Sequence, residues 1–193
     1  MAGKLYLCAT PIGNLEDITF RVLETLRSVD VIAAEDTRHT IKLLNHFDIK
    51  TPLTSYHEYN KVDKAYQLVE KMQQGTNIAL ITDAGTPGIS DPGEDLVRIC
   101  YEQGIEVTSL PGAAACITAL TLSGLPTRRF SFEAFLPKEK KERAAVLEEL
   151  KNDTRTLIVY EAPHHLLGTL KELQNALGDR RLTVCRELTK KFE

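Results

Sequence analysis

The chain has 193 residues, of which 42% are hydrophobic and 26% charged, a balance typical of a globular protein with a buried core. No run approaches the roughly 18 apolar residues of a membrane-spanning helix, and the opening residues lack the long apolar core of a secretion signal. We therefore expect a cytoplasmic protein without a membrane partner. The four cysteines show no zinc spacing, so no metal site is expected.

The formal net charge of −3 is distributed unevenly along the chain. Residues 1–112 contain 10 Lys and Arg against 16 Asp and Glu, whereas residues 113–193 contain 14 against 11. This change of sign predicts two domains with different partners, an N-terminal α/β domain at 1–112 and a C-terminal α/β domain at 113–193.

Strand-like and helix-like segments alternate through the N-terminal domain. Apolar runs predict strands at 5–10, 29–35, 77–82 and 105–110. Amphipathic stretches predict helices at 17–26, 37–46, 61–74 and 94–104. The polar segment 51–60 is interpreted as a connection. Apolar strands that alternate with helices favour mostly parallel sheets covered on both faces.

The C-terminal domain continues the alternation without a closing element. Strands are predicted at 130–136, 156–163 and 181–188, and helices at 138–151 and 164–177. Because the chain stops directly after the last predicted strand, we expect the C-terminal domain to be truncated.

Three loops at predicted strand ends, 9–19, 81–95 and 109–115, are rich in Gly, Pro and small residues. In parallel α/β sheets, ligands bind beyond the carboxyl ends of the strands, where small residues let a ligand approach backbone N–H groups. Each loop alone is equally well explained as an ordinary turn. Three of them at one sheet edge favour a pocket for a nucleotide-sized ligand, although no P-loop or GxGxxG motif is present.

Charged and aromatic residues gather in two further segments, 33–40 and 55–60. Asp36 is a plausible helix N-cap and Arg38 a plausible phosphate ligand, although a capped helix start with a local ion pair explains both. His57 can exchange a proton near neutral pH and lies beside Glu58, but the segment 55–60 also fits a surface loop. Basic residues near turns, including Arg128 and Arg129, suggest a phosphate-contacting surface or a solvated face.

Several of these segments together resemble one family. The segments are TPIGNLEDIT, AAEDTR, SYHEYN, ITDAGTPGISDPG, LPGAAACITALTLSGLPTRRFSFEAFLP and YEAPHH. They are similar to the ribosomal RNA small subunit methyltransferase I family of the tetrapyrrole methylase superfamily, from Leu5 to the last residue. The resemblance implies two α/β domains with mostly parallel sheets, the cofactor between them, and a homodimer. It also implies S-adenosylmethionine as methyl donor and the ribose 2′-oxygen of a decoding-centre cytidine of 16S rRNA, in the small ribosomal subunit, as acceptor.

The resemblance also assigns site residues by position. The expected cofactor contacts are Pro11, Asp83, Ala84, Gly85, Gly88, Ala114, Ala115 and Glu161. The sequence does not identify the group that assists the weakly nucleophilic hydroxyl, and the catalytic candidates are Asp36, His57 and Glu58. Arg38, Arg128 and Arg129 are expected to bind RNA.

Two other functions stay open. A methyltransferase acting on a tetrapyrrole or corrin small molecule would need a broad apolar cavity, whereas the EDTR segment and the paired arginines offer charge. A non-catalytic RNA-binding module would bind RNA without needing the methyl donor. A fold alone does not decide among them.

Overall fold

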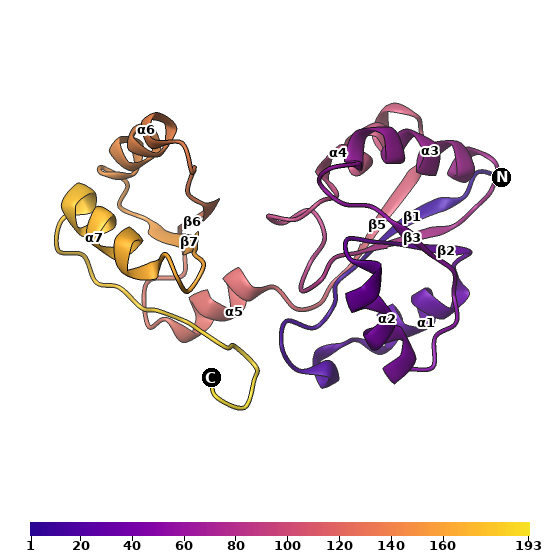
Figure 1. The fold of residues 1–193 in the computed structure, drawn as a ribbon, viewed down its shortest axis with the longest axis horizontal. Coiled ribbons are helices and arrows are strands. Elements are labelled where there is room, and N and C mark those ends of the chain that lie inside the picture. The colour runs from indigo at the N-terminus through magenta and orange to yellow at the C-terminus, as the bar shows by residue number, and fades with distance from the viewer. The chain divides into compact units, whose positions relative to one another are not determined.

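The computed structural model describes residues 1–193, which form two compact units. Unit 1 comprises Met1–Ala115 together with Glu187–Glu193, and unit 2 comprises Cys116–Arg186. No helix is both long and apolar enough to cross a membrane. Each unit has its own sheet and helices (Figure 1).

Unit 1 contains five parallel strands in the order β3-β2-β4-β1-β5. The strands are β1 (Lys4–Cys8), β2 (Val31–Ala34), β3 (Leu53–Ser55), β4 (Ile78–Ile81) and β5 (Glu106–Leu110). The helices are η1 (Leu15–Asp17), α1 (Phe20–Ser28), α2 (Thr37–His46), α3 (Lys61–Gln73) and α4 (Glu94–Glu102).

Side chains of the central strands alternate between two hydrophobic clusters, one on each face of the sheet. Ile78 and Leu80 of β4 pack in the cluster formed with α3 and α4, whereas Ala79 and Ile81 pack in the cluster formed with α1 and α2. Figure 1 shows α3 and α4 on one side of the sheet and α1 and α2 on the other. All four residues of β4 are buried because both faces are covered, which explains its uninterrupted apolar sequence.

The topology opens a crevice at the carboxyl edge of this sheet. The chain leaves β1 and β2 toward α1 and α2, but leaves the intervening β4 toward α4 on the opposite face. Neighbouring strands whose connections diverge in this way form a topological switch point, the usual ligand-binding place in open α/β sheets.

Unit 2 is built around two parallel strands, β6 (Phe130–Phe135) and β7 (Thr156–Tyr160). Its helices are α5 (Ala115–Leu122), α6 (Lys140–Leu150) and α7 (Leu166–Leu177). The strand register shifts between Phe132 and Ala134, where Ala134 has φ of 51°. The expected α/β class with mostly parallel sheets is confirmed.

Two element predictions are wrong. The strand predicted at 181–188 does not form, because the alternating apolar side chains there find no strand to pair with. Conversely, β3 lies within the polar segment 51–60, where three half-buried residues pair with β2 at the sheet edge. An edge strand with limited burial lacks the apolar run by which a central strand is identified.

Candidate functional site

The three glycine-rich and proline-rich loops of unit 1 are joined by hydrogen bonds beyond the strand ends. Thr10 and Gly85 exchange two backbone hydrogen bonds, with N···O distances of 2.9 and 3.0 Å. The Thr86 hydroxyl donates to the carbonyl oxygen of Ala113 over 2.9 Å. The loops after β1, β4 and β5 therefore form one connected edge, as the sequence analysis expected from parallel strands.

Small residues are required where these loops approach one another. Gly85 has φ of 86°, a left-handed conformation that L side chains rarely adopt. A Cβ on Gly112 would lie 2.7 Å from the Cβ of Ala9, closer than two carbon atoms can pack. These glycines allow the main chain of neighbouring loops to lie side by side.

The expected cofactor residues fall into two groups. Seven of them belong to the connected loops of unit 1, whereas Glu161 follows β7 in unit 2. The unit 1 group is Pro11, Asp83, Ala84, Gly85, Gly88, Ala114 and Ala115. Asp83 and Ala84 are exposed, so this loop presents both a carboxylate and bare backbone to solvent.

Carboxylates gather at the ends of β2 and β4. The backbone N–H of Asp36 donates to Oδ1 of Asp83 over 3.2 Å, and the Asp83 N–H donates to the Glu35 carboxylate. Burial and the Asp83 carboxylate raise the pKa of Glu35. Burial, together with the nearby Glu35 carboxylate, raises the pKa of Asp91 to about 6. The edge thus holds one carboxyl group, that of Asp91, which can exchange a proton close to neutral pH, beside Glu35, whose pKa is also raised.

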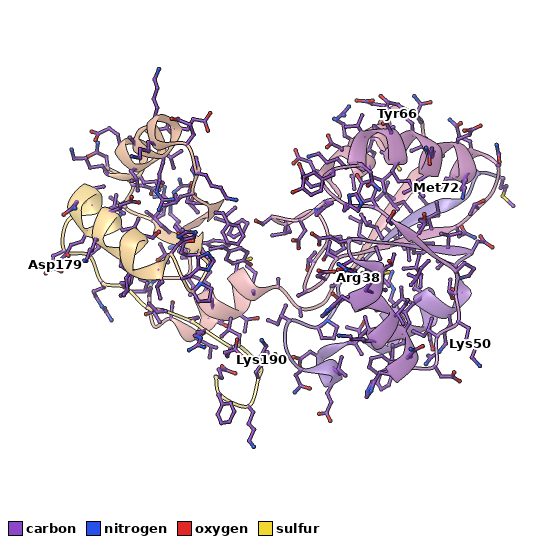
Figure 2. The ribbon with its side chains drawn as sticks, in the orientation of Figure 1. Arg38, Lys50, Tyr66, Met72, Asp179 and Lys190 are labelled. Atoms are coloured by element: carbon purple, nitrogen blue, oxygen red, sulfur yellow. The ribbon has the colours of Figure 1, made fainter.

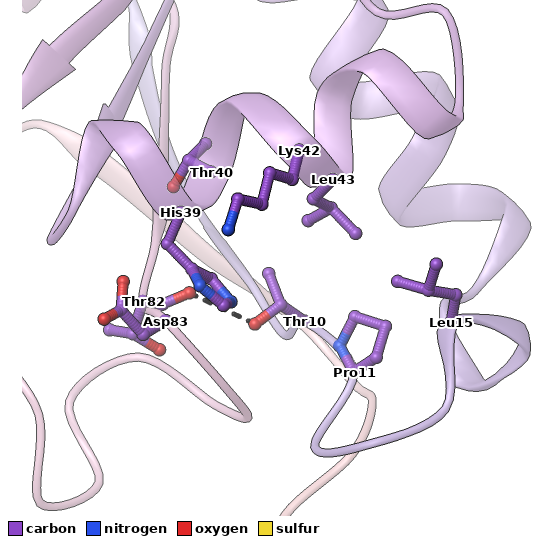
Figure 3. Close-up of a pocket in the computed structure, with 9 residues that line it drawn as sticks. All are labelled: Thr10, Pro11, Leu15, His39, Thr40, Lys42, Leu43, Thr82 and Asp83. Carbon is purple, nitrogen blue, oxygen red and sulfur yellow. Dashed lines mark hydrogen bonds between the residues drawn. The ribbon is translucent and has the colours of Figure 1, made fainter.

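A pocket lies beside these loops, on the side of the sheet that carries α2. Figure 3 shows the side chains around it, contributed by the loop after β1, by α2 and by the loop after β4. It is lined by Thr10, Pro11, Leu15, His39, Thr40, Lys42, Leu43, Thr82 and Asp83. The pocket therefore sits at the topological switch point and shares Pro11 and Asp83 with the expected cofactor residues.

The catalytic candidates have different surroundings. Asp36 caps α2 and accepts hydrogen bonds from the backbone and guanidinium of Arg38, which hold its pKa well below the ordinary range. Nδ1 of His57 is buried without a hydrogen-bond partner. Glu58 forms an ion pair with Lys61 over 2.8 Å and is largely exposed.

The arginines expected to bind RNA are exposed in both units. Arg38 points into solvent from the start of α2 (Figure 2) and pairs with Asp36 over 2.8 Å, the local arrangement that the sequence also allowed. Arg128 and Arg129 are exposed in unit 2, directly before β6.

Glu161 takes part in a polar network within unit 2. Its carboxylate accepts hydrogen bonds from the Thr169 hydroxyl and from the N–H of Ala162. Arg143 donates to the Thr169 oxygen over 2.8 Å and pairs with Glu172 over 2.6 Å. Burial raises the pKa of Glu161, but these hydrogen bonds outweigh it and leave the pKa below its ordinary value. The carboxylate is therefore held ionised in one orientation.

The sequence analysis assigned no catalytic or binding role to four residues that the tertiary structure brings to this edge: Glu35, His39, Lys42 and Asp91. Glu35 and Asp91 each lie within a segment that the sequence analysis quoted, directly after a strand or inside the Gly-rich loop. Only burial distinguishes them from their exposed neighbours, and burial depends on the packed fold.

Comparison with known proteins gives matches over nearly the full chain. A family model described as "Tetrapyrrole (Corrin/Porphyrin) Methylases" matches residues 4–193. A relative from Synechocystis named "Ribosomal RNA small subunit methyltransferase I" is 58% identical over 99% of this chain and 69% of its own. A relative of the same name from Halalkalibacterium halodurans is 56% identical over 99% of this chain and 66% of its own. The chain thus spans about two thirds of the length of these relatives.

Solved structures show the same fold at low sequence identity. Diphthine synthase superimposes with a TM-score of 0.69 at 16% identity, covering 90% of this chain and 72% of that one. Uroporphyrin-III-C-methyltransferase from Thermus thermophilus superimposes with a TM-score of 0.61 at 22% identity, covering 90% and 73%. The resemblance stated from sequence motifs is therefore confirmed: the chain belongs to the tetrapyrrole methylase family and, within it, to the ribosomal RNA small subunit methyltransferase I family.

Proposed function

We propose that this chain transfers a methyl group from S-adenosylmethionine to the ribose 2′-oxygen of a decoding-centre cytidine in 16S rRNA. Membership of the family supports S-adenosylmethionine as the methyl donor and ribosomal RNA as the class of acceptor. The structural observation that carries the proposal is the joining of the three loops through Thr10, Gly85, Thr86 and Ala113. This arrangement provides a preformed surface beyond the strand ends for the methyl donor.

The residues on this surface fit an adenosyl ligand. Ala84 is small and exposed directly after β4, and Ala114 and Ala115 are small at the start of α5. Pro11 adds an apolar wall, and the Asp83 carboxylate can accept hydrogen bonds from ribose hydroxyls or an ammonium group. When bound, S-adenosylmethionine supplies an electrophilic methyl group on a sulfonium. We propose Glu161 as a further contact from unit 2.

The chain's main contribution to catalysis is positioning. Methyl transfer is an in-line displacement, and aligning two reactants is worth about 7–11 kcal/mol when the reacting atoms are held in contact. Gly85 and Gly88, both in left-handed conformations, set the path of the loop that would carry the donor. Rigid loops held by backbone hydrogen bonds suit this role, because they lose little entropy on binding.

The acceptor hydroxyl must lose a proton during transfer. Asp36 and Glu58 are paired with cations, so they are better suited to orienting the hydroxyl than to removing its proton. His57 acts electrostatically on Glu35, and Asp91 has a pKa near 6. We add Glu35 and Asp91 to His57 as candidate proton acceptors and keep Asp36 and Glu58 as candidates for orienting the hydroxyl, because a general base works best with a pKa near the working pH.

We propose that RNA phosphates are contacted by Arg38, Arg128 and Arg129, because exposed guanidinium groups bind phosphate in a bidentate manner.

The family resemblance further suggests a homodimer. The cytoplasm is the proposed location because small ribosomal subunits are assembled and used there.

The decisive experiment incubates the chain with S-adenosylmethionine carrying a labelled methyl group and with small ribosomal subunits that lack the modification. We expect label in rRNA, recovered after nuclease digestion as 2′-O-methylcytidine by mass spectrometry. Asp83→Ala is expected to reduce the label, whereas Asp48→Ala, a change at an exposed residue of the same unit, is expected to leave it unchanged.

Other outcomes identify the rival functions. Binding of RNA with equal affinity in the presence and absence of S-adenosylmethionine, without any methyl transfer, would identify an RNA-binding module. Methylation of a corrin precursor but not of rRNA would identify the small-molecule enzyme. Either result would overturn the proposed function.

A further inference from the structure

The pocket beside α2 contains two basic side chains that the proposed function has not used. His39 and Lys42 lie three residues apart on α2, so they share one face of the helix. Figure 3 shows both side chains extending from α2 into the space bounded by Thr10 and Pro11. The pocket has a volume of about 210 Å³, which suits a fragment of a larger ligand better than a whole cofactor.

The charges around the pocket favour an anion at Lys42. Arg38, on the neighbouring turn, is paired with Asp36, and Lys50, beyond the end of α2, is paired with Asp48. Lys42 forms no such ion pair, although residues 1–112 carry 16 acidic residues against 10 basic ones. A cation that stays unpaired in an acidic domain and points into a pocket is a candidate anion ligand.

The other residues that line the pocket place a polar group on one side and apolar groups on another. Asp83 offers a hydrogen-bond acceptor on one side, and Pro11, Leu15 and Leu43 form an apolar wall. A ribose-phosphate unit of RNA fits this lining, because its sugar ring packs against apolar side chains and its phosphate pairs with a cation, while Asp83 stays available to the methyl donor.

The location of the pocket agrees with that ligand. Pro11 and Asp83 line the pocket and also belong to the loops proposed to hold the methyl donor. A ribose must come within contact distance of the transferred methyl group, so a site for its sugar-phosphate backbone must adjoin the donor loops.

We propose that this pocket binds a ribose-phosphate unit of the acceptor RNA, with Lys42 and His39 on the phosphate and the apolar wall of Pro11, Leu15 and Leu43 against the sugar ring. The proposal rests on the proposed function, because it assumes that the acceptor is RNA. It differs from the arginine contacts predicted from sequence, because it assigns the phosphate to His39 and Lys42 at the pocket rather than to Arg38, which is paired with Asp36.

The test compares Lys42→Ala, Lys42→Arg and Lys50→Ala. Binding of a fluorescein-labelled single-stranded RNA oligonucleotide is measured by anisotropy over a range of salt concentrations, and binding of S-adenosylmethionine is measured by calorimetry. We expect Lys42→Ala to weaken RNA binding by about tenfold at low salt. The slope of log Kd against log salt should fall by about 0.7, the value for one phosphate contact on a single strand.

The matched variants distinguish an effect of the positive charge at the pocket on RNA binding from the effect of losing any positive charge. Lys42→Arg keeps the cation and should retain most of the RNA affinity. Lys50→Ala removes a lysine at the opposite end of α2 from Arg38 (Figure 2) and should change neither affinity nor slope. His39→Gln, which keeps a hydrogen-bond donor but cannot be cationic, should weaken RNA binding less than Lys42→Ala does. Circular dichroism confirms that each variant is folded.

Three results would overturn the inference. A loss of S-adenosylmethionine affinity in Lys42→Ala would assign the pocket to the charged tail of the methyl donor. Unchanged RNA affinity in Lys42→Ala, with a wild-type chain that methylates rRNA, would reject the pocket but keep the proposed function. A wild-type chain that neither binds nor methylates RNA would reject both.

Discussion

The backbone N–H of Asp36 donates a hydrogen bond to Oδ1 of Asp83 across 47 residues of sequence, with an N···O distance of 3.2 Å. The N–H of Asp83 in turn donates to the carboxylate of Glu35. These contacts connect the ends of β2 and β4, the strands on either side of the crevice. They hold the Asp83 carboxylate in place before any ligand binds, which is the condition for efficient positioning.

The first prediction concerns the charge of Asp83. Asp83→Asn keeps an oxygen that accepts the Asp36 hydrogen bond but removes the negative charge that disfavours ionisation of its neighbours. We expect the pKa values of Glu35 and Asp91 to fall, that of Asp91 from about 6, as measured by NMR titration of the carboxyl carbons. Asp48→Asn, at an exposed site paired with Lys50, should move neither value. Unchanged titration in Asp83→Asn would contradict the electrostatic coupling.

The second prediction compares two left-handed glycines. Gly85 has φ of 86° and Gly104 has φ of 68°, so alanine at either position should destabilise unit 1 by about 1–2 kcal/mol in urea unfolding. Only Gly85→Ala should weaken S-adenosylmethionine binding, by about tenfold, or roughly 1.4 kcal/mol. The reason is location: a Cβ on Gly85 would meet Ile12 and Ala113 of the neighbouring loops, whereas one on Gly104 would meet open space.

An equal loss of cofactor affinity in both glycine variants would show that strain in unit 1, rather than the shape of this loop, controls binding. Calorimetry of the two variants at the same temperature distinguishes the cases.

The third prediction concerns stability between pH 4 and pH 6, taken from the ordinary pKa of Asp91, 3.8, and its raised value of about 6. A carboxyl group whose pKa is raised by folding binds more protons in the folded state than in the unfolded state. The free energy of unfolding therefore falls as pH rises through this interval, and Glu35 contributes in the same direction. We expect a loss of about 1–3 kcal/mol for Asp91.

Asp91→Asn should flatten this part of the stability profile, measured by urea unfolding at several pH values. Asp36 and Asp153, whose pKa values are lowered by hydrogen bonds from Arg38 and Arg155, act in the opposite direction and mainly below pH 4. A stability that rises from pH 4 to pH 6 in the wild-type chain would refute the assignment to Asp91.

The fourth prediction concerns the network around Glu161 in unit 2. Thr169 is buried and connects Arg143 to Glu161 through its hydroxyl, so Thr169→Val removes one hydrogen bond from each of these two largely buried charged groups. We expect unit 2 to lose about 1–3 kcal/mol and the pKa of Glu161 to rise. Thermal unfolding followed by circular dichroism measures the first effect, and NMR titration the second.

Thr169→Ser retains the hydroxyl and is the matched control, with a smaller loss from the missing methyl group. If the valine variant proves as stable as the serine variant, the hydroxyl does not hold Glu161 in place.

Residues 37–46 illustrate what local sequence determines. The predicted helix matches α2 over its full length, because the Asp36 side chain accepts the Arg38 N–H and so determines where the helix starts. The apolar run 77–82 likewise predicted β4, whose residues are buried on both faces. In both cases the deciding interactions lie within the segment or in its hydrophobic pattern.

Residues 181–188 and the segment 51–60 illustrate the opposite case. A strand exists only when another strand pairs with it, and the pairing partner is absent from the local sequence. The alternation at 181–188 finds no partner, whereas polar residues become β3 because β2 lies beside them. β-propensity describes a fit to a half-buried surface and cannot supply that surface.

The candidate site also combines features that the sequence determines with features that only the tertiary structure decides. The composition of the loops at 9–19, 81–95 and 109–115 was enough to expect a ligand at one sheet edge, since the carboxyl ends of parallel strands meet there. Tertiary structure alone decided that Lys42 lines a pocket with Thr10 and Asp83, and that Asp91 is half-buried near Glu35. Burial and the distance between charges depend on contacts between segments far apart in the sequence, and these are set only when the sheet assembles.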